Sequence, residues 1–243
     1  MCIRFATRVL AFSCCLLAGS FGLAQDTQSD AKKVSDGDAN AHVLILGDSI
    51  SIGYTPFVTE LMKDEAKVVR PTNANGGAEN CAGTTKGVPN IDRWLALDGG
   101  NWDVIHFNFG LHDIKHVQPE SGQNSNDPNH PHQASPEKYE EQLRAIVEKL
   151  KATGAKLIYA TTTPVPDGGV RPYRLPSDVE KYNEIAVRIM KENDIAVNDL
   201  YAFVLPRMEE IQRPVNVHFT DEGSQALAEE VVKHIRKALG DAE

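Results

Sequence analysis

The stretch His42–Ser51, HVLILGDSIS, decides the fold of this 243-residue chain. Its four consecutive apolar residues, Val43 to Leu46, are typical of a strand buried on both faces of a parallel sheet. The run ends at Gly47-Asp48-Ser49, and apolar residues then recur at helical spacing as far as Met62. We therefore expect a buried strand, a tight turn and a helix, with the hydroxyl of Ser49 at the carboxyl edge of the sheet.

That position gives Ser49 a chemical meaning. Open α/β sheets bind ligands at the carboxyl ends of their strands, and the N–H groups that begin a helix favour negative charge. An exposed hydroxyl beside such donors is what acyl transfer requires, because the donors stabilise an oxyanion. The plainer interpretation of the same residues is an ordinary turn capped by Asp48 or Ser49.

The remaining sequence alternates between strand-like and helix-like segments. Ser135 is the expected cap of the second predicted helix, and Ser177 with Glu180 forms a capping box for the third. The alternation predicts a single-domain three-layer α/β/α sandwich with a mainly parallel five-stranded sheet. The further strands are expected at residues 67–70, 102–109, 155–161 and 195–198, and the helices after the first at residues 137–151, 178–191 and 221–239.

The first residues are expected to lie outside this domain. Residues 1–24 carry two arginines, no acid and a short apolar run, which predicts a signal peptide. A single membrane anchor is the alternative, but the run is short and no second apolar span follows. We expect residues 25–41 to be a disordered leader and residues 42–243 to be the folded domain. The protein is then exported, periplasmic or extracellular, and not integrated in a membrane once the signal is removed.

Charge and cysteine content narrow the possible partners. The net charge is −9, and no cluster of basic residues is present, which argues against nucleic acid and anionic membranes as partners. Arg171 and Arg174 are local cations that could offset this charge for an anionic substrate. Cys81 is the one cysteine beyond the predicted signal, so no internal disulfide is expected, and a small buried residue is its simplest role.

Four short blocks, in order along the chain, carry a family resemblance. They are Gly47-Asp48-Ser49-Ile50-Ser51, Asn80-Cys81-Ala82-Gly83-Thr84-Thr85, Gly110-Leu111-His112-Asp113 and Val215-Asn216-Val217-His218. Together they resemble the blocks of the SGNH (GDSL-type) hydrolases, a family of serine esterases, and they span nearly the whole predicted domain. The resemblance implies a flavodoxin-like sheet.

The resemblance also implies roles for individual residues. Ser49 is the expected nucleophile and His218 the expected base. The oxyanion hole would be formed by the N–H groups of Ser49 and Gly83 and by the ring of His112. His112 replaces the asparagine of the family pattern.

The last block departs from the family pattern in a second place. Val215 replaces the aspartate that normally orients the histidine, and valine cannot do so. Asn216 is a possible orienter of His218, and a backbone carbonyl is another. Asp221 is close in sequence, but it more simply serves the positive end of the last helix.

Two loops should line the substrate. The polar segment 116–134 has no apolar periodicity, and a loop of this length is often functional. It leaves the same sheet edge as the segment 161–166. The candidate lining residues are Asn108, Asp113, Thr163 and Pro164.

We expect a secreted serine esterase that hydrolyses short acyl esters, acetyl above all, on carbohydrates. Its partner is then a small-molecule or glycan ester. A lipid esterase or thioesterase and an envelope-glycan acyltransferase are enzymatic alternatives. A non-catalytic carbohydrate-binding module with the same fold is an alternative of another class, which the missing aspartate supports.

Histidines in the polar loop raise the question of a metal. His112 and His116 are four residues apart, and His130 and His132 follow. A pair at this spacing on a helix can bind zinc, but the segment follows a strand and Pro119 argues against a long helix. We therefore expect no metal and no cofactor.

Overall fold

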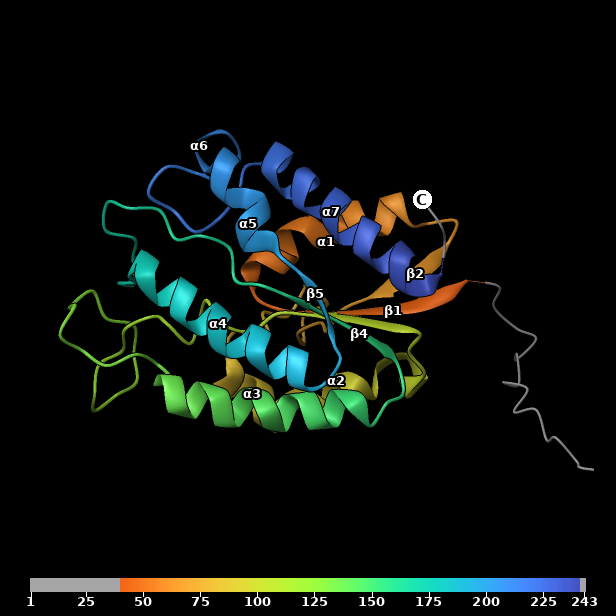
Figure 1. Ribbon diagram of the computed structural model, residues 1–243, viewed down its shortest axis with the longest axis horizontal. Helices are drawn as coiled ribbons and strands as arrows, with labels where there is room; N and C mark the ends of the chain where they lie inside the picture. The colour runs from red at the N-terminus through yellow and green to blue at the C-terminus, as the bar shows by residue number, and fades with distance from the viewer. Residues whose placement is uncertain (1–39, 241–243) are drawn as a thin grey trace, which may run out of the picture. The chain divides into compact units, whose positions relative to one another are not determined.

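Five parallel strands form the centre of the structure, a computed structural model that describes residues 40–240 (Figure 1). The predicted signal peptide and nearly all of the predicted leader lie outside these residues. All five predicted strands are present, with boundaries that differ by up to two residues. The strands are β1 (Ala41–Leu46), β2 (Ala66–Val69), β3 (Val104–Phe107), β4 (Lys156–Ala160) and β5 (Ala196–Asn198).

Strand β1 occupies the inside of the sheet, as its apolar run predicts. Val43 pairs with Val68 of β2 on one side and with Val104 of β3 on the other. Val43 to Leu46 are completely buried. Complete burial of each such side chain stabilises the fold by roughly 1.5–3 kcal/mol relative to exposure. The burial of this stretch therefore holds β1 in the centre of the sheet and the turn of Ser49 at its carboxyl end.

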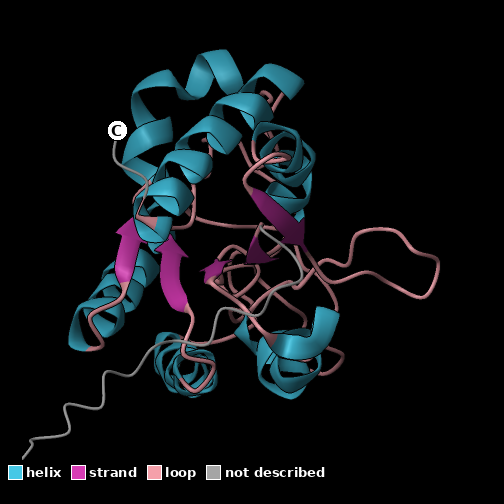
Figure 2. Cartoon of the chain, turned by 90° about the vertical axis from the view of Figure 1, so that its right-hand side faces the viewer, coloured by secondary structure: helices cyan, strands magenta, loops and turns pink. Residues whose placement is uncertain are grey.

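Helices cover both faces of the sheet, so the predicted three-layer sandwich is confirmed (Figures 1 and 2). One face carries α1 and α7, which pack against each other, and the short helices α5 and α6 lie beside them. The other face carries α2, α3 and α4. The bounds are α1 (Ser49–Leu61), α2 (Thr84–Leu95), α3 (Pro136–Lys151), α4 (Pro176–Glu192), α5 (Leu200–Val204), α6 (Met208–Ile211) and α7 (Asp221–Leu239).

The observed N-termini of α3 and α4 can be compared with the predicted capping residues. Ser135 caps α3 by accepting a hydrogen bond from the Lys138 N–H (3.3 Å), as predicted. The capping box of Ser177 and Glu180 is wrong, because α4 begins earlier, at Pro176, and Leu175 precedes it without a side-chain cap. Proline has the backbone φ of a first helical turn and needs no N–H acceptor there. Helix α2 was not predicted, since Gly87 and Pro89 interrupt its pattern.

The strand order places the carboxyl ends of β1 and β3 at a topological switch point. The order is β2-β1-β3-β4-β5, so the chain moves outward in opposite directions from these two neighbouring strands. Crevices at such points are where open α/β sheets bind ligands. Ser49 follows β1 and residues 108–113 follow β3, so the fold brings two of the four sequence blocks to this crevice.

Within residues 40–240, the helices are all too short or too polar to cross a membrane.

Candidate active site

Three side chains form a hydrogen-bonded chain at the carboxyl edge of the sheet. His218 Nε2 lies 2.9 Å from Ser49 Oγ, although the two residues are 169 positions apart. On the other side of the ring, His218 Nδ1 lies 2.8 Å from Asn216 Oδ1. The structure thus brings together the three residues that the sequence suggested as nucleophile, base and orienter.

The hydrogen bonds also determine which ring nitrogen of His218 carries the proton. Asn216 Oδ1 accepts from the His218 backbone N–H (2.9 Å), and a backbone N–H can only donate, so the amide oxygen faces the histidine. Nδ1 must therefore donate to this oxygen. Nε2 is left without a hydrogen and can accept the proton of Ser49, as a general base must.

Ser49 owes its position to the residue before it. Asp48 is the N-cap of α1, and its carboxylate accepts from the Ile50 N–H (2.8 Å). The Ser49 N–H remains in the first turn of the helix, and no acceptor for it is found in the part of the chain that the structure describes. Burial raises the pKa of Asp48, although the Ile50 hydrogen bond and the charge of Arg174 oppose that rise.

A second loop approaches the turn of Ser49 from the side of α2. The Cys81 N–H donates to the Gly47 carbonyl (3.1 Å), which ties the two segments together. Ala82 next to it has a left-handed backbone (φ 56°), which is uncommon for a residue other than glycine and is found where function fixes the backbone. Like that of Ser49, the Gly83 N–H has no acceptor among residues 40–240.

Asp113 lies directly beneath Gly83. It is fully buried, and both its oxygens accept from the Thr84 N–H (2.9 and 3.1 Å). A β-carbon on Gly83 would come within 2.6 Å of this carboxyl, so only glycine fits here. Burial raises the pKa of Asp113 to about 7 in spite of its Thr84 hydrogen bonds.

His112 lies close enough to His218 for the two rings to interact electrostatically. Burial lowers the pKa of His112 to about 3, and the charges of Lys115, Arg174 and His218 add to that effect. The ring is therefore neutral at ordinary pH. A neutral imidazole still has one N–H to donate.

Comparison of the sequence with known protein families identifies the family of this chain. The sequence profile of the GDSL-like Lipase/Acylhydrolase family matches residues 45–226, from the strand before Ser49 to the helix after His218. The chain belongs to this family. It is therefore an SGNH-type hydrolase of carboxylic esters.

Solved structures share the fold of this hydrolase at low sequence identity. An acetyl xylan esterase, AlAXEase, is 17% identical with a TM-score of 0.61, and the match covers 80% of this chain and 99% of that one. A lipase/acylhydrolase from Enterococcus faecalis is 18% identical (TM-score 0.63; 81% and 96% covered). A mutant of Axe2, an acetyl-xylooligosaccharide esterase from Geobacillus Stearmophilus, is 16% identical (TM-score 0.60; 81% and 95% covered). No significant match is found among curated proteins.

A pocket of about 510 Å³ adjoins the hydrolase's histidine. Two loops line it, residues 168–171 after β4 and residues 215–218. The predicted substrate-lining segment 161–166 ends just before the first of these loops. The Asp167-Gly168-Gly169 turn at the sheet edge is the signal that could have extended the prediction.

The four residues predicted to line the substrate do not line this pocket. Asp113 is buried under Gly83, and Pro164 is buried with its carbonyl bonded to Gln212 Nε2 (2.9 Å). Both side chains are therefore buried in this structure, because the chain turns into the domain after β3 and β4 before it reaches the surface. Asn108 and Thr163 line a second cavity of about 10 Å³ beside Asp48, which has room for about one water molecule.

Arg174 is a buried cation beside the site. Its side chain is held by the Leu111 carbonyl (Nε, 2.8 Å) and the Pro172 carbonyl (Nη1, 3.2 Å). Desolvation lowers the pKa of Arg174 to about 10, so the group stays charged at neutral pH. Together with burial and Arg213, it lowers the pKa of His218 below its ordinary value.

The second departure from the family pattern has a conformational consequence. Val215 has a left-handed backbone (φ 50°) and is 52% exposed, with its side chain near Gly168. The residue at the usual aspartate position therefore does not orient the ring. Asn216, one residue later, makes the contact with His218.

Cys81 is completely buried, as expected for a small core residue. Burial raises the pKa of its thiol to about 11, so it carries almost no thiolate at neutral pH.

Proposed function

We propose that the protein is an exported serine esterase that removes short acyl groups, acetyl above all, from carbohydrate hydroxyls. The observation that carries the proposal is the chain of contacts from Ser49 Oγ through both nitrogens of His218 to Asn216. A histidine with its unprotonated nitrogen against a helix-start serine is the arrangement that activates a hydroxyl for attack on an ester.

The proposed reaction has two halves. Ser49 Oγ attacks the ester carbonyl carbon while its proton passes to His218 Nε2. The tetrahedral intermediate then collapses, the ester C–O bond breaks, and His218 returns the proton to the leaving sugar oxygen. In the second half, His218 takes a proton from water while the hydroxide attacks the acyl carbonyl carbon. The second tetrahedral intermediate then collapses, the bond between the acyl carbon and Ser49 Oγ breaks, and His218 returns the proton to Ser49 Oγ as the acid leaves.

Three donors would stabilise the oxyanion of each intermediate. They are the N–H groups of Ser49 and Gly83, which lack protein acceptors among the described residues, and the neutral ring of His112. Removing one donor from such a hole typically costs about 10²–10³ in rate. Burial keeps His112 uncharged, so it would act as a fixed dipole and not as a competing acid.

The carbohydrate assignment rests on the character of the site and its relatives. The pocket beside His218 is lined mainly by glycine and polar residues, with Arg171 and Asn216 among them. Two of the structural relatives are esterases of acetylated xylan or xylo-oligosaccharide. Export is proposed from the signal-like residues 1–24.

A fluorophosphonate label tests the serine mechanism. The full chain is incubated with the reagent and the labelled residue is mapped by mass spectrometry, with activity on an activated acetyl ester measured in parallel. We expect label on Ser49 and loss of both label and turnover in Ser49→Ala. Ser51→Ala is the matched control, because Ser51 lies in the same turn but bonds the Asp48 carbonyl (2.7 Å). Wild-type turnover in a folded Ser49→Ala protein would refute the mechanism.

A chain-length series tests the acyl preference. We expect kcat/KM to fall from acetyl through butyryl to octanoyl esters of one alcohol. A steady rise towards octanoyl would instead favour a lipid esterase.

A further inference from the structure

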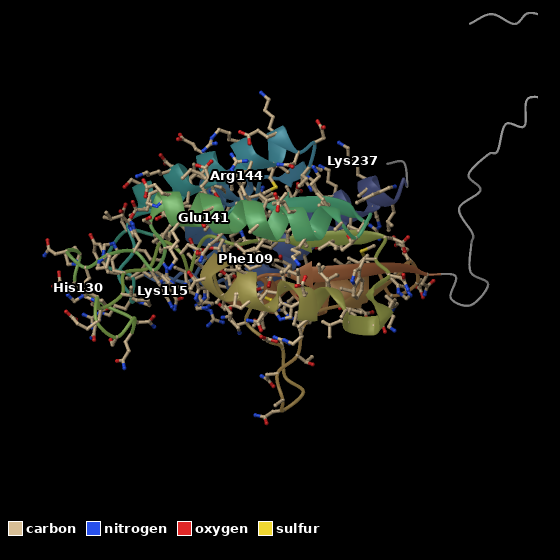
Figure 3. The ribbon with its side chains drawn as sticks, turned by 90° about the horizontal axis from the view of Figure 1, so that it is seen from below. Phe109, Lys115, His130, Glu141, Arg144 and Lys237 are labelled. Carbon is tan, nitrogen blue, oxygen red and sulfur yellow. The ribbon has the colours of Figure 1, made fainter. Side chains whose placement is uncertain are left out.

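Two histidines of the polar loop between β3 and α3, neither of them part of the proposed catalytic chain, pack edge-on against each other. His116 and His132 form an antiparallel bridge, and their ring centroids are 4.8 Å apart. Figure 1 shows this loop beside the start of α4, and Figure 3 places Lys115 and His130 of the loop at the end of the domain opposite Lys237.

Helix α4 brings a carboxylate to the same point. Asp178, in its first turn, has Oδ2 2.9 Å from His132 Nε2. One ligand atom from each of His116, His132 and Asp178 can be chosen so that all three lie within 4.8 Å of one another. Three parts of the sequence thus supply two imidazoles and one carboxylate to one small volume.

The ring nitrogens of His116 lack hydrogen-bond partners among the described residues. The residue is 5% exposed, and neither ring nitrogen has a hydrogen-bond partner. Buried polar atoms nearly always have a partner, and each exception needs an explanation. The hydrogen bond between His132 and Asp178 does not involve His116, whereas a metal ion would give a ring nitrogen of His116 its partner.

We propose that His116, His132 and Asp178 bind a divalent metal ion of the zinc type, with water as the fourth ligand. Two imidazole nitrogens and one carboxylate oxygen suit zinc, whose bonds to them are about 2.0–2.2 Å in a tetrahedral arrangement. Ligand atoms around such an ion are about 3.3 Å apart, so rotations of the side chains bring these donors into range. His112, which the sequence placed in a possible metal pair with His116, takes no part.

The surroundings fit ligating histidines. The ring of Tyr173 packs edge-on against His116 (4.9 Å between centroids), and that of Tyr182 packs edge-on against His132 (5.8 Å). The carbonyls of Asp127 and His130 lie near the His116 ring, although neither completes a hydrogen bond with it. Ligating histidines commonly direct their second nitrogen to a backbone carbonyl.

The ion would have a structural effect on the active site. The backbone N–H of His116 donates to the Tyr173 carbonyl (3.0 Å). The residue after Tyr173 is Arg174, whose side chain donates to the carbonyl of Leu111, the residue immediately before His112. Metal binding would therefore fix the loop that carries His112, while Ser49 and His218 contribute no ligand.

Zinc and cobalt binding to the full chain tests the proposal. After chelation and dialysis, the protein is titrated with Zn²⁺ by calorimetry and with Co²⁺ by visible absorption, and Tm is measured with and without Zn²⁺. We expect one ion per chain, the absorption of tetrahedral Co²⁺ and a rise in Tm. A wild-type protein that binds no stoichiometric ion, or that binds Co²⁺ with only an octahedral spectrum, would overturn the proposal whether or not any variant folds.

Two ligand variants and one control assign the site. His132→Gln and Asp178→Asn should each raise the Kd for Zn²⁺ by at least about 10- to 100-fold. A loss of that size is already usual when a residue that only hydrogen-bonds a metal ligand is removed. His130→Gln should leave the Kd unchanged, because His130 lies in the same loop but bonds Ser125 Oγ (2.7 Å). Unchanged binding in both ligand variants, or equal weakening in His130→Gln, would contradict the assignment.

Discussion

At the scale of single residues, the most informative position is Asn216. An amide in this place can fix the tautomer of His218 but has no charge with which to stabilise the imidazolium formed during catalysis. The site therefore combines the geometry of a triad with the electrostatics of a dyad. Burial and two arginines lower the pKa of His218, which keeps the base unprotonated at pH values where a free histidine would be charged.

Asn216→Asp tests this account. A carboxylate 2.8 Å from His218 Nδ1 favours the cation, so the pKa of His218 should rise and the acid limb of the pH–rate profile should move to higher pH. One pKa unit corresponds to about 1.4 kcal/mol. Asn216→Ala should lower kcat by more than about tenfold, because the ring loses its orienter. The measurement is kcat and kcat/KM against pH.

Val215→Asp is the matched control for that experiment. It adds the same charge at the position where the family pattern has its aspartate, but the Val215 side chain is exposed and near Gly168. We expect a smaller shift of the acid limb than in Asn216→Asp. A larger shift from Val215→Asp would mean that Asn216 is not the orienter.

At the scale of elements, the site depends on loops that leave adjacent strands and are fixed by buried contacts. Gly83 is held over the Asp113 carboxyl, and Asp113 is fixed by Thr84. Because the buried Asp113 carboxyl lies within 2.6 Å of where a β-carbon on Gly83 would be, a side chain there can be accommodated only by displacing the loop.

Gly83→Ala should therefore reduce kcat by about 10²–10³, the usual effect of losing an oxyanion donor, with a smaller change in KM. Steady-state kinetics on an acetyl ester, with circular dichroism to verify folding, measures this. Gly77→Ala, in the exposed part of the preceding loop, is the control and should behave as wild type. Full activity in Gly83→Ala would contradict the expected displacement of the loop, because alanine keeps the backbone N–H and only adds a β-carbon beside Asp113.

His112→Ala tests the loop that follows β3. If the ring N–H binds the oxyanion, the bond strengthens in the transition state, so kcat should fall more than KM rises. His112→Asn restores the residue of the family pattern and should recover part of the loss. A change confined to KM would assign His112 to substrate binding instead.

At the scale of the whole molecule, the net charge of −9 opposes the approach of anionic substrates. Salt shortens the range of this field from about 30 Å at 0.01 M to about 8 Å at 0.15 M. We expect kcat/KM to rise with salt for an acetylated oligosaccharide that contains a uronate and to stay constant for a neutral one. A fall with salt for the anionic substrate would show that Arg171 and Arg174 dominate its approach.

The sequence alone predicted the sheet, most of the helices, and the serine and histidine that the structure brings together. Burial of Val43 to Leu46 requires a central strand, and the Gly47-Asp48-Ser49 turn must then lie at the strand's carboxyl end. These are local consequences of hydrophobic periodicity and turn chemistry. The same reasoning failed for α2, where Gly87 and Pro89 hide the helix, and for the start of α4, where Pro176 sets the first turn.

Only the tertiary structure decided which distant groups meet. Of the two orienters that the sequence left open, the side chain of Asn216 makes the contact with His218 Nδ1, and the spacing of residues could not choose between them. Asp113 became a buried support for Gly83 because the chain turns inward after β3. Asp178 reaches His116 and His132 only because α4 packs beside the polar loop. Contacts of this kind depend on how elements pack, which no single stretch of sequence encodes.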